Sequence, residues 1–135
     1  MITEENKQTA FEIVKNTPYL NLLGIELVEI TKEKVVMSLE MRQKLRQPYG
    51  LLHGGATASL IDTAMAFAVI TAIGTEEKAT TVDLTVQYLR PVTEGKVFCT
   101  AKVTRLGKRL LFLSAEVAND KEKLIATALS TYTKV

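Results

Sequence analysis

The 135-residue sequence predicts an α+β fold in which a curled antiparallel β-sheet wraps around one central apolar helix. Three observations support this fold class. Residues 54–75 are apolar apart from a few hydroxyl groups and hold one ionised side chain. The segments around them alternate apolar and polar residues, which is typical of half-buried strands. A helix that is apolar on every side must be covered on every side, so we expect one face to lie on the sheet and the other on a second subunit.

The composition fits a single globular domain spanning residues 1–135 and excludes several functional classes. The chain is 47% hydrophobic and 24% charged, with a net charge of +2, which does not favour a nucleic-acid surface. The single cysteine, Cys99, cannot form an internal disulfide and is expected to be a small buried apolar residue. The start MITEENKQ lacks the pattern of a signal peptide. We therefore expect a cytoplasmic protein.

The first 41 residues are expected to form a short helix followed by a β-hairpin. Thr3 precedes two glutamates, as at a helix start, and the segment 16–18 (Asn-Thr-Pro) ends that helix. The runs GIELVEI (24–30) and VVMSLEM (35–41) follow as two strands. A loop that contains a proline and a glycine occupies residues 42–53.

The long apolar segment is expected to be a helix from about Gly55 to Ile73, ended by Gly74. Its length also suits a membrane span. However, Asp62 and five Ser or Thr residues lie between residues 54 and 75 without a flanking basic cluster, which favours a core helix and no membrane partner. Four further strands follow, separated by turn signals: 81–88, 97–103, 111–117 and 124–135.

The stretch LLHGGATASLID, residues 51–62, brings together the only histidine, a glycine pair and one carboxylate. A helix N-terminus presents unpaired N–H groups that suit the oxygen of a tetrahedral intermediate. A carboxylate such as Asp62 can act as a nucleophile or as a general base, and both routes stay open. The chain has no GxSxG, P-loop or GxGxxG motif, and one His with one Cys does not supply a His/Cys metal site.

The run LHGGATASLIDTAMAFA resembles the hotdog-fold acyl-CoA thioesterases, in the branch that includes the phenylacetyl-CoA catabolic thioesterase and the second thioesterase-superfamily member of animals. The resemblance extends to TTVDLTVQYLRP (80–91) and LGKR (106–109), and so covers nearly all of the chain past residue 20. It implies a hotdog fold, two chains joined edge to edge, and hydrolysis of an acyl-CoA to a free acid and coenzyme A. Water would be the co-substrate, with no metal and no further cofactor.

The resemblance also implies roles for individual residues. Asp62 would be the catalytic carboxylate, and the Gly54 N–H would polarise the thioester carbonyl. His53 would help to shape the loop before the helix. Thr81 matches a position where some relatives carry a serine that assists the attacking water. Gln47 departs from the pattern, because many relatives have asparagine there, near the reacting centre.

The spacing of two of these residues requires a second subunit. Asp62 follows Gly54 by eight residues, which is about 12 Å along a helix. A reacting carbonyl must lie roughly 3 Å from both its attacker and its oxyanion donor. If both groups act, they come from different chains, so we expect a homodimer with two sites; a homotetramer is the further option.

The sequence does not decide between an aliphatic and an aryl acyl group. Either would fit an apolar pocket, which we expect to be lined by Leu51, Leu52, Ile61, Met65 or Phe67. Arg90, Lys108 and Arg109 are candidates for the phosphates of coenzyme A, with Lys102 and Arg105 ranked below them.

Three alternatives remain. Asp62 can be a purely structural carboxylate hydrogen-bonded near the dimer seam. The protein can be a non-catalytic acyl-CoA sensor or binding module of the same fold. It can also be a hotdog dehydratase of hydroxyacyl thioesters, a chemistry that pairs a histidine with a carboxylate. His53 precedes Asp62 by nine residues, so that pair would have to meet across a dimer.

Overall fold

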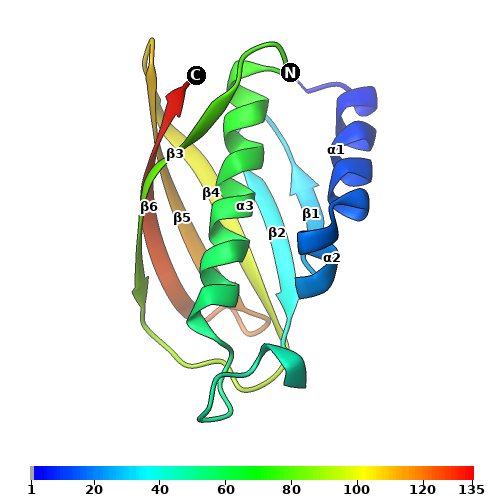
Figure 1. The fold of residues 1–135 in the computed structure, drawn as a ribbon, viewed down its shortest axis with the longest axis vertical. Coiled ribbons are helices and arrows are strands. Elements are labelled where there is room, and N and C mark those ends of the chain that lie inside the picture. Colours follow the sequence, from blue (N-terminus) through cyan, green and yellow to red (C-terminus); the bar gives the residue numbers. More distant parts are fainter. Residues whose placement is uncertain (1) are drawn as a thin grey trace.

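The structure, a computed structural model, describes residues 2–135, so Met1 of the expected domain lies outside the described residues. The helices are α1 (Glu4–Asn16), α2 (Pro18–Leu23) and α3 (Gly54–Ile73), with a 3₁₀ turn at Gln43–Leu45. The strands are β1 (Glu26–Ile30), β2 (Val35–Glu40), β3 (Ala79–Tyr88), β4 (Lys96–Leu106), β5 (Leu110–Asn119) and β6 (Leu124–Lys134), as labelled in Figure 1.

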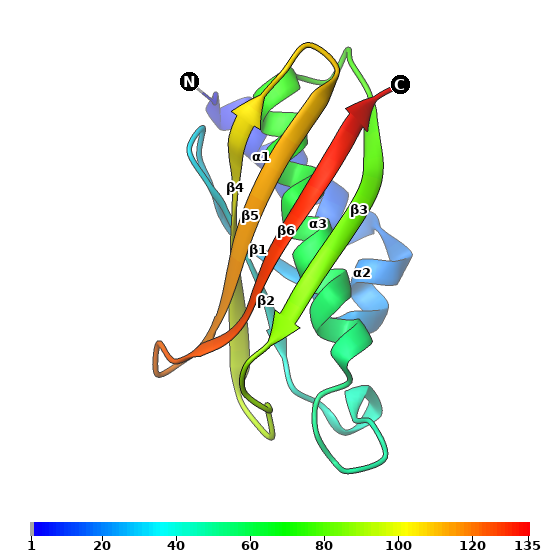
Figure 2. The ribbon, with the colours of Figure 1, turned by 90° about the vertical axis from the view of Figure 1, so that its left-hand side faces the viewer.

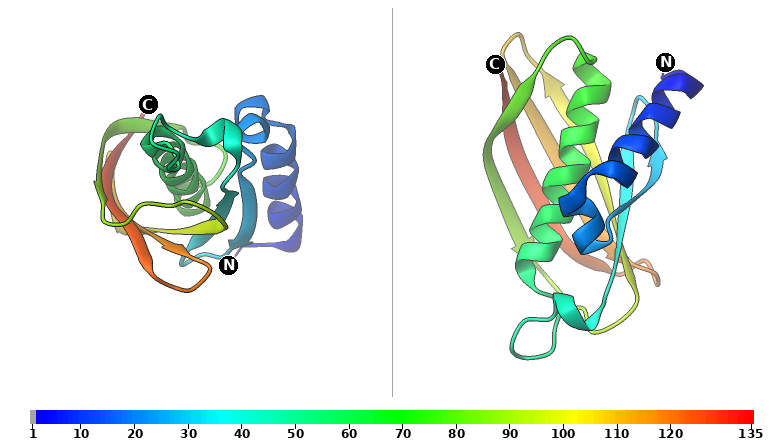
Figure 3. Two further views of the ribbon diagram at one scale, coloured as in Figure 1. Left: turned by 90° about the horizontal axis from the view of Figure 1, so that it is seen from below. Right: turned by 45° about the vertical axis from the view of Figure 1, so that its right-hand side comes forward.

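The strands form one antiparallel sheet in the order β1-β2-β4-β5-β6-β3. Figure 2 shows the sheet from its outer side, with α3 lying behind it and running along its length. Seen from below in Figure 3, α3 occupies the centre and the sheet curves around it, while α1 and α2 lie beside β1. The expected α+β fold is therefore confirmed, and β1 and β3 are the two free edges of the sheet.

The core lies between α3 and the inner face of the sheet. By length and hydropathy α3 would suit a membrane span, and here it is the core helix, with nine buried residues. The helix begins at Gly54, one residue before the expected start, because His53 is its N-cap. It ends at Gly74, as expected. Buried residues of the facing strands include Met37, Leu39, Val97, Leu111, Leu113 and Val117.

The N-terminal region contains a helix that the sequence interpretation missed. The segment 16–18 does end α1, but Pro18 is also the first residue of α2. Proline suits this position because a backbone N–H there would have no partner within the helix, so its absence costs no hydrogen bond. Gly24 ends α2 with a φ of 77°, and the Ile25 N–H donates to the Leu20 carbonyl at 2.9 Å. The first strand consequently begins at Glu26, two residues later than expected.

A bulge in β3 determines which of its residues face α3. Thr81 pairs with Tyr132 and Asp83 pairs with Thr131, so Val82 is the extra residue and is 57% exposed. Strict alternation would put Thr81 on the same outer face as Asp83. The extra residue reverses that parity and turns Thr81 towards the central helix.

Candidate active site

Asp62 lies half-buried on α3 and is held by two strands of the sheet. The Thr81 hydroxyl donates a hydrogen bond of 3.0 Å to Asp62 Oδ1. The Tyr132 hydroxyl lies 2.9 Å from the same oxygen and 3.1 Å from the Asp62 backbone carbonyl. Thr81 and Tyr132 are direct partners across β3 and β6, so the two hydroxyls converge on one carboxylate.

Tyr132 was not predicted as a site residue. It is 3% exposed, and burial raises its pKa, with the neighbouring Asp62 carboxylate adding to the rise. The phenol therefore keeps its proton at neutral pH and can act as a donor. The available signal was its position in the last strand: Ala126, Ala128 and Ser130 are buried at alternate positions, and Tyr132 continues that row.

The N-terminus of α3 leaves one backbone donor free. The Gly55 N–H donates to His53 Nδ1 at 2.8 Å. The N–H groups of Ala56 and Thr57 donate to the His53 carbonyl at 2.9 and 3.4 Å. Within residues 2–135, the Gly54 N–H has no acceptor, so it is the donor that a ligand oxygen can bind. The structure thus places His53 at the N-cap and Gly54 at the first helical position.

Tyr88 fixes this helix end from the sheet. Its hydroxyl donates to the Gly54 carbonyl at 2.6 Å, and burial raises its pKa, so the phenol stays protonated at neutral pH. A Cβ atom on Gly54 would lie 3.3 Å from the Tyr88 ring, and one on Gly55 would lie 2.9 Å from His53 Nδ1. Close approach by neighbouring side chains therefore favours glycine at both positions. Tyr88 is a second site residue that the sequence interpretation missed.

A cavity of about 310 Å³ opens at this end of α3. Gln47 lines it, and its Oε1 accepts hydrogen bonds from the backbone N–H groups of Tyr49 and Leu51. Because Oε1 binds its own loop, the Nε2 amide is the part of Gln47 that can reach a ligand. Further lining residues are Leu51, Leu52, Gly54, Tyr88 and Arg90.

The structure corrects the expected apolar pocket. Leu51 and Leu52 do line the cavity, as expected. Ile61 and Met65 are completely buried in the core, because they lie on the side of α3 that packs on the sheet. Phe67 lines a different cavity, between α1 and the C-terminal half of α3. These three residues therefore do not belong to the pocket beside Gly54.

Asp62 and Gly54 lie in separate parts of one chain. Asp62 does not line the cavity beside Gly54. Both residues are in α3, so their spacing corresponds to about 12 Å of helix rise. Their partners on β3 show the same separation, because Thr81 binds Asp62 and Tyr88 binds Gly54. One chain thus presents the carboxylate and the free N–H at two different places.

The candidate cations are also divided between the two ends of the sheet. Arg90 follows β3 and lines the cavity beside Gly54. Lys108 and Arg109 form the β4–β5 turn, and the Arg109 carbonyl accepts from the Lys134 N–H at 2.8 Å. Lys134 pairs with Ala79, the opposite end of the ten-residue β3. At about 3.3 Å per residue the two groups lie roughly 30 Å apart in one chain.

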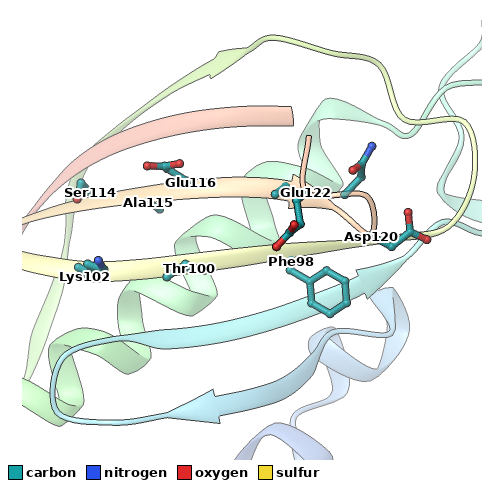
Figure 4. Close-up of a pocket in the computed structure, with 10 residues that line it drawn as sticks. Phe98, Thr100, Lys102, Ser114, Ala115, Glu116, Asp120 and Glu122 are labelled. Atoms are coloured by element: carbon teal, nitrogen blue, oxygen red, sulfur yellow. The ribbon is translucent and has the colours of Figure 1, made fainter. Parts of the chain in front are cut away.

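A larger cavity, of about 540 Å³, lies on the outer face of the sheet. Figure 4 shows Thr100 and Lys102 on β4, with Ser114 and Glu116 on the neighbouring β5. Thr100 and Lys102 alternate with residues that face α3, so this cavity is on the side of the sheet away from Asp62. Lys102 is therefore remote from the cavity that Arg90 lines.

Within residues 2–135, no group of three or more His, Cys, Asp or Glu side chains is arranged to hold a metal ion. The candidate site therefore consists of the Asp62 carboxylate with its two hydroxyl donors, and the Gly54 N–H with its adjoining cavity.

Sequence and fold comparisons define the class of protein. Residues 49–126 match the family described as "Thioesterase superfamily". The chain is 30% identical to human acyl-coenzyme A thioesterase 13, over 96% of this chain and 94% of that protein. It is 29% identical to the 1,4-dihydroxy-2-naphthoyl-CoA hydrolase of Listeria monocytogenes, over 81% of this chain and 89% of that protein. The protein is thus a thioester hydrolase.

A solved structure agrees with this class. The E. coli PaaI protein, from the phenylacetic acid degradation operon, superposes with a TM-score of 0.87 at 25% identity. The match covers 96% of this chain and 92% of that one. The chain belongs to the thioesterase superfamily and has the hotdog fold, as the motif had indicated.

Proposed function

We propose that this protein hydrolyses acyl-CoA thioesters to a free acid and coenzyme A, with Asp62 as the catalytic carboxylate. One observation carries the proposal: a half-buried carboxylate, alone on an otherwise uncharged helix, is fixed by hydroxyls from two strands. Thr81 donates its proton to Asp62, so towards an attacking water it would act as an acceptor. Gly54 of the partner subunit would donate to the carbonyl oxygen as negative charge develops there.

The dimer follows from the separation of the two groups. One carbonyl cannot lie about 3 Å from both an attacker and a donor that are some 12 Å apart in one chain. β3 is a free sheet edge, and pairing two copies of it antiparallel about a two-fold axis brings opposite ends together. Asp62 of one chain would then approach Gly54 of the partner subunit. Each dimer would contain two equivalent sites.

The same pairing gives the cations a common role. It would bring the β4–β5 turn of one chain, with Lys108 and Arg109, towards the end of the sheet where Arg90 of the partner subunit lies. We propose that these residues bind the phosphates of coenzyme A, since paired cations at the rim of a site suit a charged ligand. The cavity lined by Leu51, Leu52 and Gln47 would receive the rest of the substrate near the reacting bond.

Two chemical routes fit this arrangement. Asp62 can attack the thioester carbon, forming an acyl-enzyme anhydride while the C–S bond breaks and the thiolate takes a proton; water then hydrolyses the anhydride. Alternatively, Asp62 removes a proton from water, which attacks the carbonyl directly. Both routes yield the same acid and thiol. The relatives named for an acyl-CoA and for a naphthoyl-CoA make aliphatic and aryl acyl groups the two classes to test.

The test is thiol release from a panel of aliphatic and aryl acyl-CoAs, with wild type, Asp62→Asn and a control, Asp83→Asn. The control makes the same chemical change on the outer face of β3, where Asp83 Oδ1 accepts from the Thr131 N–H at 3.0 Å, a bond that the asparagine oxygen can keep. We expect the Asp62 variant to lose at least about 100-fold in kcat and the control to keep wild-type kcat.

Wild-type turnover in the Asp62 variant would show that Asp62 has only a structural role. Product masses separate hydrolysis from dehydration, because dehydration leaves the thioester intact. Binding of an acyl-CoA without turnover by any of the three proteins would support the sensor alternative.

A further inference from the structure

We propose that Tyr132 is a positioning residue that, together with Thr81, orients the Asp62 carboxylate so that Oδ2 is the reacting oxygen. This inference rests on the proposed catalytic role of Asp62. It adds a residue from the last strand to the site, and it assigns the two carboxylate oxygens different tasks.

Both hydroxyls bind the same oxygen. Thr81 Oγ1 lies 3.0 Å and the Tyr132 hydroxyl 2.9 Å from Asp62 Oδ1. The second oxygen, Oδ2, has no donor among residues 2–135. Every buried side-chain oxygen or nitrogen in residues 2–135 has a hydrogen-bond partner, so an oxygen without a partner is not buried. Oδ2 is therefore accessible, with lone pairs free to attack a carbonyl carbon or accept a proton from water.

Tyr132 is well suited to hold the carboxylate in place. Its hydroxyl contacts both Oδ1 and the backbone carbonyl of Asp62, so it fixes the side chain relative to its own helix turn. Its ring is 3% exposed and lies on β6 directly opposite Leu111 of β5. An aspartate side chain alone can rotate about two torsions. Donors from two adjacent strands select one orientation before substrate binds, which lowers the entropic part of the barrier.

Because Tyr132 is buried, we assign it a positioning role and not a catalytic one. A side chain that is 3% exposed reaches Asp62 and not the substrate. Burial raises the pKa of Tyr132, so the phenol remains a donor throughout the neutral range.

The test compares Tyr132→Phe with a matched control, Ser130→Ala. Ser130 lies on the same strand and the same inner face, is 4% exposed, and donates to Met65 Sδ of α3 at 3.0 Å without touching Asp62. We expect Tyr132→Phe to lower kcat about 10- to 100-fold, as for the loss of a hydrogen bond to a charged group. KM should stay within about twofold, since the substrate contacts are intact. Ser130→Ala should keep wild-type kcat and KM.

A second pair of variants keeps the test decisive if Tyr132→Phe does not fold. Thr81→Val removes the other donor and Thr81→Ser retains a hydroxyl, so kcat should fall in the first variant and return towards wild type in the second. Wild-type kcat in Tyr132→Phe would overturn the inference, as would an equal loss in Ser130→Ala. Asp62→Asn separates the two proposals. If it is inactive while Tyr132→Phe is normal, only the positioning role fails; if it is active, the proposed function fails.

Discussion

The Tyr88 hydroxyl donates a hydrogen bond of 2.6 Å to the Gly54 carbonyl, which fixes the first turn of α3 to the end of β3. Nearer the start of the same strand, Thr81 binds the Asp62 carboxylate. One edge strand therefore holds both halves of the candidate site, at points separated by seven residues. An edge strand is also the element that can pair with a second copy. The arrangement links the geometry of the site directly to dimer formation.

The free N–H of Gly54 can be removed by a proline, which adds a Cβ atom 3.3 Å from the Tyr88 side chain. Gly54 is the first helical residue, a position that suits proline. His53 has φ −61° and ψ 130°, which is the extended conformation that a residue before proline prefers. Gly54→Pro should lower kcat about 100-fold or more, as expected for loss of an oxyanion donor. Gly54→Ala adds a similar Cβ contact to Tyr88 but keeps the N–H, and should lose much less. Equal losses in both variants would show that the Tyr88 contact, not the donor, matters.

The cations at the two ends of the sheet give a prediction about coenzyme A. If the β4–β5 turn binds the nucleotide phosphates, Arg109→Ala should raise KM for acyl-CoA about 10-fold, the effect of one charge-assisted contact. KM for the matching acyl-pantetheine, which lacks those phosphates, should not change. Lys15→Ala, on the exposed face of α1 and away from the β3 edge, is the control and should leave both KM values unchanged. An equal rise for both substrates in Arg109→Ala would remove Arg109 from the phosphate site.

Cys99 predicts how stability changes at alkaline pH. Burial raises the pKa of its thiol from 9.0 to about 12, so the folded state favours the protonated form. This stabilisation is complete below pH 9 and is lost as the pH rises from there towards 12. The free energy of unfolding should therefore fall above pH 9, by up to about 1.4 kcal/mol per pH unit from this one group.

Urea unfolding between pH 8 and pH 10, for wild type and Cys99→Ala, measures this effect. The variant lacks the thiol, so its free energy of unfolding should fall less steeply over the interval. The same slope in both proteins would contradict the assignment to Cys99.

The fold was predictable because its main signals are local. The apolar run of α3, the period of two in the flanking strands and the turn residues each lie within a short segment. The second helix was missed because a proline that ends one helix can also begin the next. The contacts of Asp62 were not predictable in this way, since Tyr132 is 70 residues away along the chain.

The position of Thr81 shows a further limit. Its side chain faces α3 only because Val82 is an extra residue in the pairing with β6, and the alternating pattern carries no mark of that bulge. Likewise, the separation of Arg90 from Lys108 and Arg109 depends on strand register and not on their distance in sequence. Register and bulges are set by tertiary pairing, so local patterns do not reveal them.

The most direct test of a site shared between two subunits is activity after mixing two inactive variants. Asp62→Asn and Gly54→Pro are unfolded together in equal amounts and refolded, and thiol release is measured against wild type treated in the same way. Random pairing makes half of the dimers mixed, and each mixed dimer has one site with an intact carboxylate and an intact N–H. We predict recovery of about 25% of wild-type activity. Activity that stays at the level of the two parent variants would contradict the shared site, because it would mean that both groups must act from one chain.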